Sequence, residues 1–248
     1  MDLRERPAAE VPRHPWEVAR SRFFLDVLDR FGALDRPRDW LDVGAGDAWA
    51  AEQLHRRLPA PATVVGWDIN YTSEDLDRCD KVPGVQLTAT RPDGSFGGML
   101  LLDVIEHVGD DQAFLGDILT NLAAPRSWVL VSVPAHPALF SDHDRFLQHY
   151  RRYRSRQLLE VLDRAGVEVL ASGGVFHAPL VARAAAVAGQ RLLRRPGSEG
   201  GVGAWSGGPA VTSAVTAALR LDTKVSLLVA GRRRHLPGLS FWAMGRAG

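Results

Sequence analysis

Short apolar runs alternate with segments of helical periodicity from residue 39 to residue 133, and this alternation constrains the fold more than any other feature. The runs predicted as strands are 39–43, 63–67, 85–89, 99–102 and 128–133; the segments predicted as helices are 16–34, 47–58, 73–78 and 110–123. Strands that alternate with helices form a parallel sheet covered by helices on both faces. The chain therefore predicts an α/β fold with a doubly wound sheet.

The second half of the chain departs from this alternation before its last strand. A helix at 156–164 and a strand at 167–175 are followed by two apolar helical stretches, 179–193 and 210–230, and then by an alternating segment at 239–244. Because this strand comes after both helical stretches, we expect the two helices to be an insertion between the last two strands of the sheet. We expect one domain with a loose lead-in at 1–15, a core at 39–175, a helical insertion at 178–236 and a final strand at 239–246.

Composition excludes several classes of protein. With 248 residues, 46% of them hydrophobic, the chain is long enough to bury a sizeable core. A net charge of +1 gives no overall field that would attract nucleic acid, so we expect no nucleic-acid partner. One cysteine cannot form an internal disulfide, and the first residues lack the apolar stretch of a secretory signal. These features predict a cytoplasmic protein.

A glycine-rich turn follows the first predicted strand, in the sequence Leu-Asp-Val-Gly-Ala-Gly-Asp from Leu41 to Asp47. Gly44 and Gly46 allow a tight turn with positive φ and a close backbone approach to a ligand. Asp68 ends the second predicted strand, where a carboxylate can accept hydrogen bonds from both hydroxyls of a ribose. The pair predicts a nucleotide site at the carboxyl edge of the sheet.

The residues around this turn discriminate between nucleotides. A dinucleotide site needs a third glycine where this chain has Trp49, and Asp42 would repel a pyrophosphate. A carboxylate at Asp42 can instead bind the ammonium group of a nucleoside that carries an amino acid. The pattern favours S-adenosylmethionine over NAD.

These residues, together with Leu-Leu-Asp-Val-Ile-Glu-His-Val at 101–108, resemble the motif series of class I S-adenosylmethionine-dependent methyltransferases. The resemblance covers about residues 39–175 and the last strand. It implies a Rossmann-like sheet of seven strands, mostly parallel with one antiparallel strand, and an enzyme. It also implies that the cofactor S-adenosylmethionine is bound by Asp42, Gly44, Ala45, Gly46, Asp68, Ile69, Asp103 and Val104.

Asp103, Glu106 and His107 are spaced as ligands on one face of a helix. Some O-methyltransferases of this class bind a divalent ion with such residues, whereas in other members the same sequence braces the cofactor pocket without a metal. The second alternative is favoured, and no metal is expected.

A stretch rich in histidine, tyrosine and arginine follows the fifth predicted strand. It resembles a segment of bacterial methyltransferases of surface glycan or lipid-linked sugar pathways. His143, His136 and His149 are candidates for the base that deprotonates an acceptor, in that order. Arg151 and Arg152 could pair with an anionic group of the substrate, or they could cap or solvate the following helix.

The predicted function is methyl transfer from S-adenosylmethionine to a small-molecule or lipid- or glycan-linked acceptor, on oxygen. The alternative is a nucleotide-binding scaffold or regulator of a biosynthetic complex that transfers nothing. The insertion is edged by Arg183, Arg191, Arg194, Arg195 and the arginines at 232–234. It could rest on a membrane as a peripheral contact, or simply cover the sheet; the protein is expected to be a monomer or a homodimer.

Overall fold

The computed structural model describes residue 3 and residues 13–79, 83–193, 205–230 and 236–248. Its centre is one sheet in the order β3-β2-β1-β4-β5-β7-β6. The strands are β1 (Trp40–Val43), β2 (Val64–Trp67), β3 (Val85–Thr88), β4 (Phe96–Leu102), β5 (Ala123–Pro134), β6 (Val167–Val175) and β7 (Ser240–Ala247). Strands β1 to β5 are parallel, and β7 runs antiparallel to both of its neighbours, β5 and β6. The predicted Rossmann-like sheet with one antiparallel strand is confirmed.

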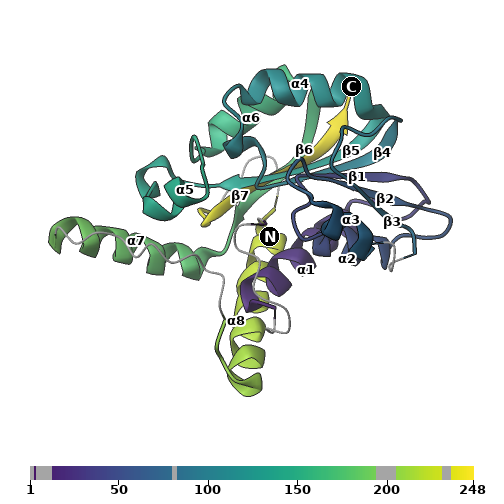
Figure 1. Ribbon diagram of the computed structural model, residues 1–248. Helices are drawn as coiled ribbons and strands as arrows, with labels where there is room; N and C mark the ends of the chain where they lie inside the picture. The colour runs from purple at the N-terminus through teal and green to yellow at the C-terminus, as the bar shows by residue number, and fades with distance from the viewer. Residues whose placement is uncertain (1–2, 4–12, 80–82, 194–204, 231–235) are drawn as a thin grey trace.

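Helices cover both faces of this sheet (Figure 1). They are α1 (Pro15–Arg30), α2 (Trp49–His55), α3 (Ser73–Cys79), α4 (Asp111–Leu122), α5 (Asp142–Phe146), α6 (Ser155–Arg164), α7 (His177–Leu193) and α8 (Pro209–Val229), with 3-10 turns η2 (Ile105–His107) and η3 (Pro137–Leu139). One face carries α1, α2 and α3, and the other carries α4 and α6 (Figure 1). Two separate apolar cores result, one on each side of the sheet.

Local signals set the helix ends. The side chain of His14 accepts a hydrogen bond from the Trp16 amide, Pro15 occupies the first turn of α1, and Gly32 follows its end with a φ of 71°. Asp110 caps α4 by accepting from the Ala113 amide at 2.9 Å. The element boundaries at these ends therefore follow from residue types that sequence reasoning can recognise.

Several elements differ in extent from their predicted ranges, and one was not predicted. Helix α2 begins at Trp49 rather than at 47, because Ala48 has a left-handed backbone with a φ of 63°. Strand β5 begins at Ala123 rather than at 128; its pairing with β4 then breaks and resumes at Trp128, and the intervening Arg126 has a φ of 57°. The short helix α5 was not predicted, because five residues are too few to show a helical period.

The two helices before the last strand lie outside the layered core. Helix α8 packs against α1, whereas α7 projects away from the sheet (Figure 1). Arg194, Arg195 and the arginines at 232–234, which the sequence places at the edges of these helices, lie outside the described residues. No helix in the described part of the chain combines the length and apolar character needed to cross a bilayer.

Candidate functional site

The loop after β1 carries three residues with left-handed backbone within five positions: Gly44 (φ 64°), Gly46 (φ 55°) and Ala48 (φ 63°). The Gly44 amide donates to the Trp67 carbonyl at 2.7 Å, which ties the loop to the end of β2. A Cβ added at Gly44 would lie 2.8 Å from a methyl group of Val104, so no larger residue fits there without displacement. The backbone of this loop is thus held close to the residues after β4.

Asp68 lies at the end of β2 and faces the same loop. Its Oδ2 accepts a hydrogen bond from the Gly46 amide at 3.0 Å, and its Oδ1 accepts from the Asn70 amide at 2.9 Å. The carboxylate is partly exposed, so it can accept further hydrogen bonds from a ligand. Beside it, the side chain of Ile69 is 76% exposed, which is unusual for isoleucine.

Asp42 on β1 lies beneath the loop and is buried. Burial raises the pKa of its carboxyl group from 3.8 to about 7. Its Oδ2 has no hydrogen-bond partner in the part of the chain that the structure describes. A buried acceptor without a donor costs free energy, so this oxygen is suited to a cationic donor from a ligand.

Arg20 of α1 contacts a predicted site residue, Asp103, and sequence reasoning did not identify it. Its guanidinium lies 2.7 Å from Oδ2 of Asp103 and 3.2 Å from the Ser132 hydroxyl. It also stacks against Trp16 and Phe24, at 5.0 and 5.7 Å from their ring centroids. The aromatic residues four positions before and after Arg20 were a signal that it lies on the buried face of the helix. That signal is weak, because a lone arginine in an amphipathic helix normally faces water.

The three predicted histidines lie in different segments: His136 before η3, His143 on α5 and His149 after α5. The Nε2 atom of His136 lies 3.1 Å from the Gly238 carbonyl. The Nδ1 atom of His149 lies 3.1 Å from Asp144, whose side chain is fully buried. His143 lies on α5, where its ring is partly exposed.

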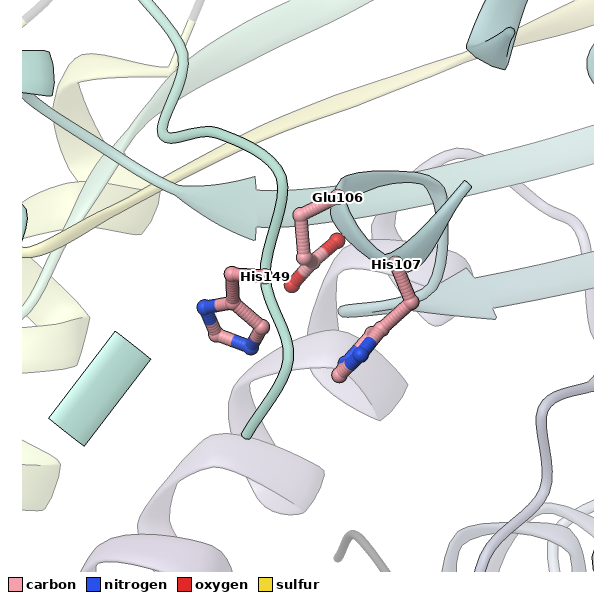
Figure 2. Close-up of side chains that lie close together, drawn as sticks. All are labelled: Glu106, His107 and His149. Carbon is pink, nitrogen blue, oxygen red and sulfur yellow. The ribbon is translucent and has the colours of Figure 1, made fainter. Parts of the chain in front are cut away.

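His149 instead lies beside Glu106 and His107, which come from η2 (Figure 2). The rings of His107 and His149 meet edge to face, with centroids 4.5 Å apart. Burial, assisted by the charge of Asp103, raises the pKa of Glu106 well above its ordinary value. The structure therefore joins two motifs that the sequence presents more than 40 positions apart.

The arginines after His149 are paired within the protein. Arg152 binds Asp144 at 2.7 Å, and Arg151 binds Asp111 at 2.7 Å. Tyr153 is buried and donates to Asp111 at 2.6 Å. In this structure both arginines have carboxylate partners in the chain itself, which favours the structural alternative over pairing with a substrate anion.

Comparisons with known proteins agree with this geometry. A family model described as a methyltransferase domain matches residues 16–172. A curated relative from Mycolicibacterium smegmatis, named "Probable S-adenosylmethionine-dependent methyltransferase", is 29% identical over 147 residues, which are 56% of this chain and 56% of that protein. The match thus spans about half the length of this relative.

Solved structures with this fold have diverse sequences. The N-methyltransferase NodS from Bradyrhizobium japonicum, in complex with S-adenosyl-L-homocysteine, superposes with a TM-score of 0.55 at 11% identity, over 99% of this chain and 96% of that one. The 4+2 cyclase SpnF superposes with a TM-score of 0.54 at 19% identity, over 92% and 81%. At these identities the likeness establishes the fold alone.

Proposed function

The chain belongs to the family of methyltransferase domains, and from this premise we propose that it transfers the methyl group of S-adenosylmethionine to an oxygen of a small or lipid-linked acceptor. The observation that carries the proposal is the buried carboxylate of Asp42, whose Oδ2 has no donor among the described residues. It lies beneath a glycine loop and near Asp68, as expected for a site that binds a nucleoside with an ammonium group.

The residues around the loop fit the polar groups of S-adenosylmethionine. Asp42 would bind its ammonium group and Asp68 its ribose hydroxyls. The exposed side chain of Ile69 would pack on the adenine. When bound, the cofactor supplies an electrophilic methyl group on a positively charged sulfur.

Replacing Asp68 with alanine should weaken the binding of S-adenosylmethionine by about 2 kcal/mol, or roughly thirtyfold, because two charge-assisted hydrogen bonds are lost. Isothermal titration calorimetry measures this. Asp39→Ala is the matched control: Asp39 joins β1 to β2 through the amide and hydroxyl of Thr63, at 2.9 and 2.7 Å, but at the opposite edge of the sheet. Equal affinities of D68A and wild type would remove Asp68 from the site.

Deprotonation of the acceptor is assigned to His143. His136 and His149 are the second and third candidates; a ring nitrogen of His136 lies beside the Gly238 carbonyl, and a ring nitrogen of His149 lies beside Asp144. His143 would take the hydroxyl proton as the acceptor oxygen attacks the methyl carbon. Asp103 would provide negative charge near the sulfur.

A lipid-linked acceptor is favoured by the exposed face of α8. The side chains of Leu221 and Leu228 are 67% and 79% exposed, and Val225 lies between them, whereas Thr223 and Ser226 are buried. Arg220 and Lys224 are exposed along the same helix. An apolar helix face with basic residues beside it is suited to the surface of an anionic membrane, which makes the protein membrane-peripheral.

Incubation of the enzyme with methyl-labelled S-adenosylmethionine and an extract of the source cells tests the proposal. We expect label in the organic phase after extraction, and a rate about a hundredfold lower for His143→Gln, as for the loss of a general base. His136→Gln is the comparison variant and should retain a much higher rate.

Each other result has a definite meaning. Label confined to the aqueous phase would contradict the lipid-linked acceptor, and an undiminished rate for H143Q would contradict the assigned base. Cofactor binding without transfer to any fraction would instead support a scaffold.

A further inference from the structure

Glu106, His107 and His149 form a cluster whose ligating atoms all lie within 4.8 Å of one another (Figure 2). The backbone fixes this proximity, because the Tyr150 amide donates to the Glu106 carbonyl at 2.8 Å. The cluster is therefore built by a contact between η2 and the segment after α5, and it does not depend on long flexible side chains.

The carboxylate of Glu106 is the unusual member of the cluster. Its residue has no solvent exposure, and neither carboxylate oxygen has a hydrogen-bond partner within the described ranges. Burial of an acid without a partner is costly. A cation held between this carboxylate and the two imidazoles would compensate that cost.

The carboxylate of Asp144 contacts one ring nitrogen of His149 and so orients the ring. Asp144 contacts Nδ1 of His149 at 3.1 Å, which leaves Nε2 as the atom that faces the cluster. Asp144 is itself held by Arg152 at 2.7 Å and by the Ser141 amide at 2.9 Å. Histidines that ligate metals commonly have such a carboxylate on the second nitrogen.

Asp103 is absent from this cluster, although the sequence spacing had grouped it with Glu106 and His107. Its carboxylate pairs with Arg20 at 2.7 Å and accepts from the Ser132 hydroxyl at 3.0 Å. The set of potential ligands that the structure brings together thus differs from the set that motif spacing suggested.

We propose that Glu106, His107 and His149 bind a divalent transition-metal ion such as Zn²⁺ or Mn²⁺, which activates the hydroxyl of the acceptor. Two imidazoles and one carboxylate suit such ions better than Mg²⁺ or Ca²⁺, which prefer oxygen ligands alone. With bonds of about 2.1 Å, ligand atoms lie roughly 3.4 Å apart in tetrahedral geometry, so the side chains must close by at most about 1.4 Å.

The role of the ion rests on the proposed function. Three protein ligands leave a coordination position for the acceptor oxygen, whose pKa falls when it binds the metal. His143 takes the hydroxyl proton, the oxygen forms a bond to the methyl carbon, and the carbon–sulfur bond breaks with its electron pair retained by sulfur. The products are the methylated acceptor and S-adenosylhomocysteine.

Titration of untagged, chelator-treated protein with Co²⁺ tests the site without the need for an acceptor, because Co²⁺ bound by nitrogen and oxygen ligands absorbs visible light. We expect one equivalent bound per chain. Glu106→Gln and His149→Gln should each weaken binding at least a hundredfold, and Asp144→Asn about tenfold to a hundredfold. The matched control is His55→Gln on α2, which should bind like wild type.

The same preparations are titrated with S-adenosylmethionine, which also reports whether each variant is folded. Absence of Co²⁺ binding by wild type, or unchanged binding by both E106Q and H149Q, overturns the metal site and leaves the proposed function standing. Co²⁺ binding that requires Glu106 and His149, in a protein that does not bind the cofactor, supports the site and contradicts the proposed function. If a variant unfolds, Glu106→Asp and His149→Asn take its place.

Discussion

Replacing Asp42 with asparagine is expected to stabilise the cofactor-free protein at pH 8 while weakening S-adenosylmethionine binding at least a hundredfold. The pKa of Asp42 rises from 3.8 to about 7 on folding, so its ionisation at pH 8 costs about 4 kcal/mol of stability. The asparagine amide carries no charge, so this cost of ionisation disappears. After the cost of burying the amide is subtracted, the free energy of unfolding still rises by about 2 kcal/mol. The lost affinity reflects removal of a buried ion pair with the cofactor's ammonium group.

The pH dependence has a definite sign. Because the folded pKa exceeds the unfolded one, the contribution of Asp42 to stability is fully present below pH 3.8 and is lost as the pH rises to about 7. Cofactor affinity should show the opposite trend and fall below pH 7, where the carboxyl becomes protonated. Chemical denaturation and calorimetry between pH 5 and 8 measure both effects.

Asp39→Asn is the control for this substitution, since Asp39 precedes the same strand but is exposed. It should change neither the pH dependence nor the affinity. An Asp42→Asn protein with wild-type affinity at pH 8 would disprove the assignment of Asp42 to the ammonium group.

Replacing Asp144 with alanine is expected to lower the free energy of unfolding by about 3–5 kcal/mol at pH 7. Asp144 is fully buried and binds Arg152, itself largely buried, so its removal leaves a buried cation without a partner. It also removes the acceptor for the Ser141 amide and for His149. Urea denaturation measures the loss.

The matched control is Asp142→Ala on the same helix, whose pairing with Arg145 is exposed and worth at most about 1 kcal/mol. Burial would raise the pKa of Asp144, but hydrogen bonds from His149 and Arg152 lower it well below 3.8. The contribution of Asp144 to stability is thus fully present above pH 3.8, its ordinary pKa, and is lost as the pH falls through the lowered pKa of the folded protein. Equal stabilities of D144A and D142A would show that the buried network does not hold this segment.

The loop geometry of the proposed cofactor site could be predicted from the sequence because its signals are local. Gly44 and Gly46 follow one strand and Asp68 ends the next, and the ends of parallel strands must meet at one edge. The structure adds the contact between Gly44 and Val104, which explains why glycine is required there. Such a clash depends on the packing of β1 against β4 and has no sequence signature.

The long-range pairings of the charged residues could not be predicted in the same way. Arg20 lies more than 80 positions from Asp103, and Glu106 lies 43 positions from His149, so neither pairing follows from periodicity or spacing. The sequence leaves two roles open for Arg151 and Arg152, because their partners Asp111 and Asp144 are set by tertiary contacts. Local motifs predicted the loop geometry, and long-range packing decided which charged groups neutralise one another.

The position of β7 has a consequence for the order in which the protein folds during synthesis. Residues 240–247 pair with both β5 and β6, so neither strand has this neighbour until those residues have been made. The strands that carry the glycine loop and Asp68 can pair much earlier. A nascent chain would therefore carry paired strands with the glycine loop and Asp68 in place, while β5 and β6 still expose the edges that β7 later covers. Unpaired strand edges are prone to aggregate.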